Sequence, residues 1–346
     1  MKKLSIDQVD LKGKKVFIRV DFNAPLENGL VTDDTRIKAA IPTIKLAISQ
    51  GARVIVASHL GRPKGEVKPE YSLLPVKEVF SKSLGAPVLF AEDCVGEKTG
   101  RLVDSLKNGE VALLENLRFH KEEENNDEDF ARALADMAEI YVNDAFGAAH
   151  RAHASTEGIT HFVKTSVAGL LMKNEIEYFS RSMINPERPL AVALGGAKIS
   201  SKLGVVDSLI DKCDILIVGG AMAFTFLKAL GVDVASNMVE DNKINEIMGV
   251  MARARKKGVK LYLPVDFVVG ESLEDDIPTE AVTRQELPPD KIAGDIGPAS
   301  SILFKLALKP ARTIIWNGPM GVFEKKPYAG GTLAVATAMA VSRALT

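Results

Sequence analysis

The sequence has little cysteine and no apolar run long enough to cross a membrane. Its 346 residues include two cysteines, Cys94 and Cys213, which is too few for a disulfide framework in a chain of this size. We expect both thiols to be reduced, buried and apolar in role, as in a reducing compartment. The uncharged run 215–227, like every other uncharged run, falls short of the roughly 20 residues that span a bilayer. The basic N-terminus lacks a following apolar region, so no signal peptide is expected.

The sequence also lacks an excess of either charge. It has 44 basic and 45 acidic residues, which gives a formal net charge of −1. No overall field therefore attracts nucleic acid or an anionic membrane surface. We expect a cytoplasmic monomer whose partners are small molecules, recognised by local groups of charges.

Short β-branched runs alternate with longer segments of helical period, as in βαβ units. This alternation predicts an α/β protein with two doubly wound parallel-sheet (Rossmann-like) domains joined by a connecting helix. We expect an N-terminal domain over 1–168, the helix over 169–186 and a C-terminal domain over 187–346. The predicted strands are 16–20, 52–58, 111–115, 140–144, 190–194, 214–220, 259–266 and 312–316, and the predicted helices include 35–50, 127–138, 199–212, 243–257 and 301–308.

Two further segments give weaker local signals. The acidic run 121–129 is typical of a solvated loop leading into a helix. The last residues, 333–346, have an apolar helical pattern with no stop signal, which predicts a helix that continues to the end of the sequence.

Polar residues recur just after the predicted strands of the first half. In open parallel sheets ligands bind beyond the carboxyl ends of the strands. Because an arginine fork grips phosphate and carboxylate, the pattern favours a small, multiply negative ligand, with Asp21 and Asn23 facing a ligand hydroxyl. Isolated surface arginines and simple turn residues remain the alternative. The residues concerned are Asp21, Asn23, Arg36, His59, Leu60, Gly61, Arg62, Asn116, Arg118, His150, Arg151 and His153. The spacing of His150 and His153 has no third ligand beside it, so no zinc site is expected.

Four segments of this half carry a family resemblance: RVDFNAP at 19–25, SHLGRP at 58–63, LLENLRFH at 113–120 and NDAFGAAHRAHAS at 143–155. Together they resemble the signature segments of phosphoglycerate kinase. Ala148 stands where that family often has threonine. The resemblance implies a 3-phosphoglycerate site formed by Asp21, Asn23, Arg36, His59, Leu60, Gly61, Arg62, Arg118 and Arg151.

Glycine turns follow strands in the second half, in LGGAKISSK at 194–202, GGAMAFTFLKA at 219–229 and WNGPMGVFE at 316–324. Glycine lets the backbone approach a phosphate, although none of these segments is a Walker motif. No GxGxxG with a downstream acid follows a strand, which excludes a nicotinamide-dependent dehydrogenase. The three segments resemble the nucleotide half of phosphoglycerate kinase, which implies a nucleotide site of Gly196, Ala197, Lys198, Lys202, Gly219, Gly220, Gly294, Asn317, Pro319 and Glu324.

The resemblance implies reversible phosphoryl transfer between 1,3-bisphosphoglycerate and ADP, giving 3-phosphoglycerate and ATP in glycolysis. Lys198 and Arg36 are the implied catalytic residues, Mg²⁺ accompanies ATP or ADP, and no residue given is expected to be a protein ligand of a metal. Direct in-line transfer needs no protein nucleophile, and domain closure would align the substrates. Ser201 replaces the family's usual aspartate, so we expect less support for Lys202.

The family's GGGD[ST] loop is absent from the sequence. The alternative is therefore a weak or inactive form that still binds 3-phosphoglycerate.

Overall fold

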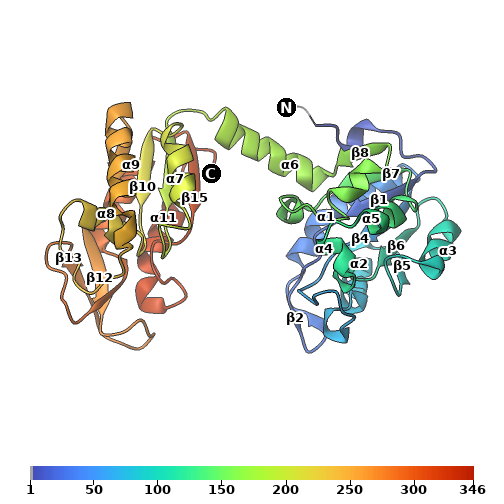
Figure 1. Ribbon diagram of the computed structural model, residues 1–346, viewed down its shortest axis with the longest axis horizontal. Coiled ribbons are helices and arrows are strands. Elements are labelled where there is room, and N and C mark those ends of the chain that lie inside the picture. The colour runs from blue at the N-terminus through green and yellow to red at the C-terminus, as the bar shows by residue number, and fades with distance from the viewer. Residues whose placement is uncertain (1–2) are drawn as a thin grey trace. The chain divides into compact units, whose positions relative to one another are not determined.

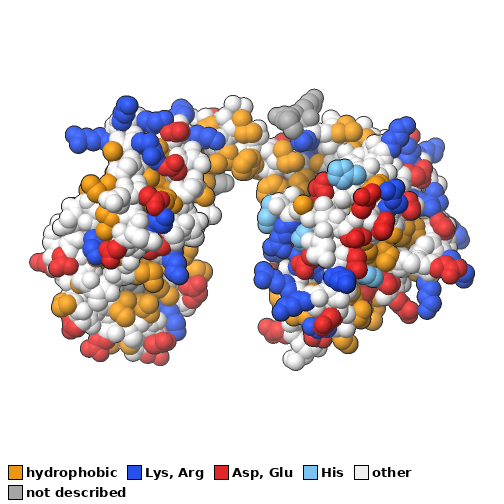
Figure 2. All heavy atoms as spheres, in the orientation of Figure 1, with side chains coloured by type: hydrophobic (Ala, Val, Ile, Leu, Met, Phe, Trp, Pro, Cys, Tyr) orange, Lys and Arg blue, Asp and Glu red, His pale blue; other side chains and the backbone are white. Residues whose placement is uncertain are grey.

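The computed structural model describes residues 3–346 and separates into two compact units, Met1–Tyr178 and Phe179–Thr346 (Figure 1). The division falls within a helical stretch, where helix α6 (Leu170–Phe179) is followed directly by a π-helical segment, Ser180–Ile184. Acidic and basic side chains are interspersed over the surface of each unit (Figure 2). Within residues 3–346, no helix combines the length and the apolar character needed to cross a membrane.

The first unit is built on a six-stranded sheet with the order β5-β6-β4-β1-β7-β8. Every neighbouring pair is parallel, so the carboxyl ends of all six strands lie at one edge. Strand β1 has β4 on one side and β7 on the other, so the strand order changes direction at β1, the place where open parallel sheets bind ligands. The bounds are β1 Lys15–Arg19, β4 Arg53–Ala57, β5 Val88–Ala91, β6 Val111–Leu114, β7 Ile140–Asn143 and β8 Thr165–Ala168.

Helices cover both faces of this sheet. Alternate residues of β1 point to opposite faces, so Val16 and Ile18 enter one core while Phe17 enters the other. The first core is closed by α1 and α2, and the second by α3 and α5. The helices are α1 Thr35–Ser49, α2 Leu74–Leu84, α3 Glu97–Ser105, α4 Lys121–Glu124 and α5 Glu128–Ala135, and a small hairpin joins β2 Leu26–Glu27 to β3 Leu30–Val31.

The second unit contains a four-stranded parallel sheet with the order β11-β10-β9-β15. Helices α7, α8 and α9 pack on one face, and α10 and α11 pack on the other. A separate antiparallel sheet has the order β13-β12-β14. The bounds are β9 Leu190–Leu194, β10 Ile215–Val218, β11 Lys260–Tyr262, β12 Asp266–Gly270, β13 Thr279–Thr283, β14 Ile292–Ile296, β15 Thr313–Asn317, α7 Leu203–Ile210, α8 Ala223–Ala229, α9 Ile244–Lys257, α10 Pro298–Leu308 and α11 Gly330–Ala340.

The α/β class with parallel sheets is confirmed, and each predicted strand segment overlaps an observed strand. The prediction of one strand over 259–266 is wrong, because β11 ends at Tyr262 and β12 begins at Asp266 in another sheet. Pro264 lies between them and has no N–H to donate to a ladder. The predicted helix 199–212 begins only at Leu203, since the preceding residues form a turn.

The prediction of a helix running to the last residue is also wrong. Helix α11 ends at Ala340, and the backbone then turns back to the edge of β15. There Ile314 N donates to Leu345 O over 2.8 Å, and Leu345 N donates to Arg312 O over 2.9 Å. These bonds add a short parallel bridge beside β15.

Both cysteines are confirmed as free and buried. Cys94 belongs to one apolar core of the first unit and Cys213 to one core of the second.

Candidate functional site

The carboxyl edge of the first sheet gathers most of the predicted anion-binding residues. Asp21 and Asn23 lie just beyond β1, and Arg36 is the second residue of α1. Arg36 Nη1 lies 2.6 Å from Asp21 Oδ2, so this ion pair orients the exposed guanidinium. Asn23 Oδ1 accepts a 2.8 Å hydrogen bond from Gly61 N. The segments that follow β1 and β4 are therefore held together.

Gly61 also connects this edge to the segment after β6. Its φ is +61°, and an added Cβ would lie 2.3 Å from the ring of Tyr71, so both the backbone and the space require glycine. Arg118 Nη1 donates to Gly61 O over 2.8 Å. Asn116 Oδ1 accepts from Leu60 N at 3.2 Å and from Arg118 N at 3.0 Å, which fixes Arg118 against the same loop.

A buried network of polar groups lies behind this edge. Arg19 and Glu123 are both fully buried, and their nearest charged atoms are 4.0 Å apart. Ser155 joins them, since Arg19 Nε donates to Ser155 Oγ at 2.8 Å and that hydroxyl donates to Glu123 Oε1 at 2.6 Å. Arg19 Nη2 also lies 3.2 Å from His59 Nδ1. The prediction that the acidic run is solvated is thus wrong for Glu123.

The electrostatics of the cluster favour an anion. Burial, together with the positive charges of Arg19, Arg118 and Arg151, lowers the pKa of His59 from 6.5 to about 2. His59 therefore stays neutral at ordinary pH. Burial also lowers the pKa of the Arg118 guanidinium. Arg118 is 3% exposed, and its Nε lies 3.3 Å from Glu124 without an aligned hydrogen bond. A buried guanidinium whose Nε lacks an aligned hydrogen bond can still bond an incoming anion.

The remaining predicted residues of this edge are more loosely placed. Arg62 is exposed and makes no hydrogen bond or ion pair with any residue in the range 3–346. Arg151 is half-buried, and its Nε is 3.4 Å from His150 Nε2. His153 is buried near Glu123, with 3.9 Å between His153 Nδ1 and Glu123 Oε1.

Three glycine turns meet at the carboxyl edge of the second sheet. Gly195 N donates to Asn317 O over 3.0 Å, and Gly220 N donates to Met320 O over 3.1 Å. The Gly196 carbonyl accepts from Met222 N over 3.0 Å. An added Cβ at Gly195 would lie 1.9 Å from Pro319 O, so these turns touch through their backbones. The three segments predicted to bind nucleotide are therefore brought together.

Lys202 ties two of these turns. Its Nζ donates to Gly195 O at 2.6 Å, to Asn317 Oδ1 at 2.6 Å and to Asn317 O at 3.2 Å. All three ammonium donors are thereby engaged, and burial lowers the pKa of the group. The expectation that Ser201 leaves Lys202 poorly supported is wrong, because Lys202 is held by Gly195 and Asn317. Ser201 Oγ donates instead to Lys198 O over 2.8 Å.

Lys198 differs from Lys202 in being exposed at the tip of its turn. Its ammonium makes no hydrogen bond or ion pair with the residues that the structure describes, although its charge acts on Glu240 and helps to lower the pKa of that carboxyl. Glu240 Oε2 accepts from Ser200 N at 3.0 Å, which fixes the far side of the turn. Lys198 is thus a cation available to a phosphate.

A cavity of about 300 Å³ opens beside the turns. Its walls are largely apolar, with Phe224, Phe267 and Ile292 among them, which suits the face of a flat ring. Asp295 also lines it and is 4% exposed, and burial raises the pKa of this carboxyl from 3.8 to about 6. The predicted residues that line the cavity are Gly196, Ala197, Gly220, Gly294, Pro319 and Glu324. Gly219 lies behind it against Met320.

The carboxylate and amide oxygens nearest the turns already accept hydrogen bonds, which bears on where Mg²⁺ would bind. This cation prefers carboxylate, carbonyl and water oxygens. Asp295 accepts from Gly331 N and Ile296 N, and Asn317 Oδ1 accepts from Lys202. The two lysines of the turns make the surroundings positive, which fits phosphate groups better than a bare cation.

Comparison with known proteins gives matches along the whole chain. A sequence model of the phosphoglycerate kinase family matches residues 6–346. The chain is 54% identical to phosphoglycerate kinase from Geobacter metallireducens over 343 residues, which cover 99% of this chain and 86% of that protein. It is 52% identical to the chloroplastic phosphoglycerate kinase 2 of Arabidopsis thaliana, with 97% of this chain and 70% of that protein covered.

Solved structures give the same result. The phosphoglycerate kinase of Coxiella burnetii matches with a TM-score of 0.89 at 38% identity, and the match covers 99% of this chain and 87% of that one. The enzyme of Pyrococcus horikoshii matches with a TM-score of 0.79 at 30% identity over the same shares. None of these matches favours the alternative of an inactive form.

Proposed function

This chain belongs to the phosphoglycerate kinase family and is a phosphotransferase of glycolysis, and we propose that each of its two domains binds one substrate. In this proposal residues 1–168 bind 3-phosphoglycerate, residues 187–346 bind ATP or ADP, and residues 169–186 connect them. The reaction is reversible transfer of a phosphoryl group between 1,3-bisphosphoglycerate and ADP, giving 3-phosphoglycerate and ATP.

The first domain would grip the acidic substrate with its arginines. Arg36 is pre-oriented by Asp21, and Arg118 by Gly61 and Asn116. Arg62 and Arg151 complete the positive surface. Because Arg118 is nearly fully buried and its Nε has no aligned hydrogen bond, a phosphate or carboxylate there gains a charge-assisted bond at a small cost in side-chain ordering. The neutral His59 ring offers the ligand a nitrogen for hydrogen bonding and adds no charge to the site.

The second domain would hold the nucleotide across the glycine turns. The apolar cavity beside Phe224 and Phe267 accepts the base, and Glu324 at its rim accepts a ribose hydroxyl. The Gly196 turn then faces the phosphates. Lys202 keeps that turn in place, while the exposed Lys198 follows the phosphoryl group and neutralises charge in the transition state. We propose that Mg²⁺ arrives with the nucleotide, on its phosphate oxygens, since the described residues offer it no ligand set.

The observation that carries this proposal is that each sheet gathers its own set of predicted ligand residues at its carboxyl edge. Titration calorimetry tests it with 3-phosphoglycerate and Mg-ADP in turn. Arg118→Met should weaken 3-phosphoglycerate binding and leave ADP binding unchanged, and Gly220→Val should do the reverse because its Cβ would lie 2.5 Å from Gly196 N. The assignment is contradicted if either variant loses binding of both 3-phosphoglycerate and ADP. It is also contradicted if either variant binds both ligands as the wild type does.

We also propose that the enzyme works as a cytoplasmic monomer on small molecules and does not act on nucleic acid or a membrane. The near-zero net charge and the two free, buried cysteines support this view. Sedimentation at micromolar concentration tests the oligomeric state, and a dimer would contradict it.

A further inference from the structure

Three potential metal ligands meet at a point that the kinase assignment does not use. Asp93 and Cys94 follow β5, and His120 follows the short 3-10 turn Leu117–Phe119 after β6. One ligand atom from each of the three lies within 4.8 Å of the others. Strands β5 and β6 are parallel neighbours, so these segments leave the same edge of the sheet side by side. We propose that Asp93, Cys94 and His120 form a binding site for a borderline-soft divalent cation of the zinc class.

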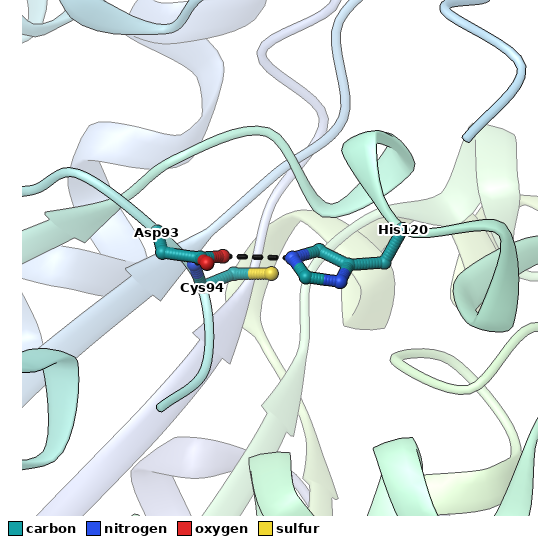
Figure 3. A group of neighbouring side chains, drawn as sticks. All are labelled: Asp93, Cys94 and His120. Carbon is teal, nitrogen blue, oxygen red and sulfur yellow. Dashed lines mark hydrogen bonds and ion pairs between the residues drawn. The ribbon is translucent and has the colours of Figure 1, made fainter. Parts of the chain in front are cut away.

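The three side chains converge on one another (Figure 3). Asp93 Oδ1 lies 2.7 Å from His120 Nε2, and the Cys94 sulfur points to the same side of the imidazole ring. A tetrahedral zinc ion has bonds of about 2.0–2.3 Å, which separates its ligand atoms by roughly 3.3–3.8 Å. The Asp93–His120 separation of 2.7 Å is below that range, and all three ligand atoms lie within 4.8 Å of one another. For a cation to enter, the Asp93 carboxylate gives up its 2.7 Å hydrogen bond to His120 Nε2.

This arrangement is unsuited to nucleophilic catalysis. In a Cys-His-Asp relay the acid and the thiol bond to different ring nitrogens, whereas here both lie at one side of the ring. Cys94 is fully buried, and burial with the nearby charges of Asp93 and Glu123 raises the pKa of its thiol. Burial is the main reason that the proton stays on sulfur. The negative charges of Asp93 and Glu123 add to this effect and also attract a cation, and a coordinating metal displaces the proton.

The surrounding structure holds two of the ligands in place. Thr99 Oγ1 donates to Asp93 O over 3.0 Å, and Cys94 N donates to Asp93 Oδ1 over 2.6 Å. The His120 ring packs on Phe130 with 5.1 Å between centroids. Such support orients ligands before the metal arrives. Asp93 and His120 keep side-chain exposures of 54% and 27%, so the fourth position opens to water.

An acidic cavity adjoins Asp93. A cavity of about 630 Å³ is lined by Asp93 itself and by Glu92, Glu97 and Lys98, so acids outnumber the single base. Binding then follows a balanced step: the Cys94 S–H bond breaks, a sulfur–metal bond forms, and one proton leaves to solvent. The metal would join the segments after β5 and β6 and stabilise the first unit by mass action.

Cobalt(II) is a suitable probe because its thiolate complexes absorb in the near ultraviolet. The full chain, freed of metal and nucleotide, is titrated with Co²⁺ and then with Zn²⁺. We expect one equivalent of Co²⁺ to give a thiolate charge-transfer band and release one proton, and Zn²⁺ to abolish the band. Cys94→Ser should lose the charge-transfer band, and His120→Gln should bind Co²⁺ more weakly. The matched control Cys213→Ser should keep the band and the Co²⁺ affinity of the wild type.

A wild-type chain without the band, or a band that survives in Cys94→Ser, would overturn the proposal. X-ray absorption of the zinc-loaded wild type gives a test that needs no variant. A sulfur neighbour at about 2.3 Å is expected, and a shell of nitrogen and oxygen alone would sink the idea. Neither measurement depends on phosphoryl transfer. A negative result would therefore reject the metal site and leave the proposed substrate sites intact.

Discussion

Arg19 and Glu123 are far apart along the chain but form a fully buried charge pair. The hydroxyl of Ser155 bridges them through one hydrogen bond to each side chain. Arg19 belongs to β1, whereas Glu123 belongs to α4, a helix of four residues. Glu123 also accepts from Ser155 N over 2.9 Å, so it fixes the segment that carries His153. The pair therefore holds in place the segments that carry His59 and His153 at the anion site.

Replacing Glu123 by glutamine should destabilise the first unit by about 3–5 kcal/mol, because Arg19 would remain as an uncompensated buried charge. Hydrogen exchange of the β1 amides, measured by mass spectrometry, reports the local loss of stability. Glu128→Gln is the matched control. That glutamate is exposed on α5, and among residues 3–346 it pairs only with Arg132, so a change within about 0.5 kcal/mol is expected. Equal exchange in both variants would refute the role of Glu123.

This pair also shows where prediction from sequence stops. The apolar runs of β1, β4, β9 and β10 are continuous and β-branched, so buried parallel strands could be predicted. Arg19 stood inside such a run, which signals a buried partner but does not identify it. Glu123 stood in an acidic run, whose local pattern is that of a solvated surface. The tertiary fold alone brings the two together.

The missed strands have a related cause. Strand β8 contains threonine and serine, so it lacks the apolar run that marks β6 and β10, which are no longer than β8. Strands β13 and β14 are partly exposed and contain glutamate, glycine and aspartate. Residues at strand ends were easier to predict, because the carboxyl edge of a parallel sheet collects them whatever the exact register.

Arg62→Ala should weaken 3-phosphoglycerate binding and leave folding unchanged. Arg62 is exposed and has no partner within residues 3–346, so its removal costs the free protein nothing, whereas one charge-assisted bond to ligand is worth about 1.5–3 kcal/mol. Titration calorimetry and thermal unfolding give the two readouts. Arg101→Ala on α3 is the control, since it removes an exposed arginine remote from the predicted residues. Unaltered affinity in Arg62→Ala would remove this residue from the site.

His59 should remain neutral down to low pH. Its pKa of about 2 lies below the ordinary 6.5, so the unfolded chain takes up a proton there before the folded one does. The contribution of His59 to stability is therefore complete above pH 6.5 and declines as the pH falls toward 2. NMR of the ring protons, assigned with His59→Asn, should show no titration between pH 8 and 5. A midpoint near 6.5 would contradict the buried, cationic surroundings.

Lys202→Met should loosen the nucleotide turns. The substitution keeps the length of the side chain but removes three hydrogen bonds, to Gly195 O and to both oxygens of Asn317. Trp316 is a local reporter, since its Nε1 donates to Gly318 O over 2.7 Å. We expect altered Trp316 fluorescence without ligand and a raised KM for ATP. Lys212→Met, two residues beyond the last residue of α7, is the control. Unchanged fluorescence and KM together would show that the tie is dispensable.

Lys198 should act in the transition state and not in ground-state binding. Its ammonium is exposed and has no partner among the described residues, so the Gly196 turn keeps its shape when the side chain is removed. Lys198→Ala should therefore lower kcat by about 10²–10³ and change KM for ATP far less, because charge gathers on the phosphoryl group only as it moves.

Steady-state kinetics in both directions, beside calorimetry with Mg-ADP, separate the alternatives for Lys198. Lys198→Arg is the informative companion variant. It restores the charge but replaces a compact ammonium by a planar fork, so we expect near-normal ADP affinity with only partial recovery of kcat. A raised KM with unchanged kcat in Lys198→Ala would show that this lysine only binds nucleotide.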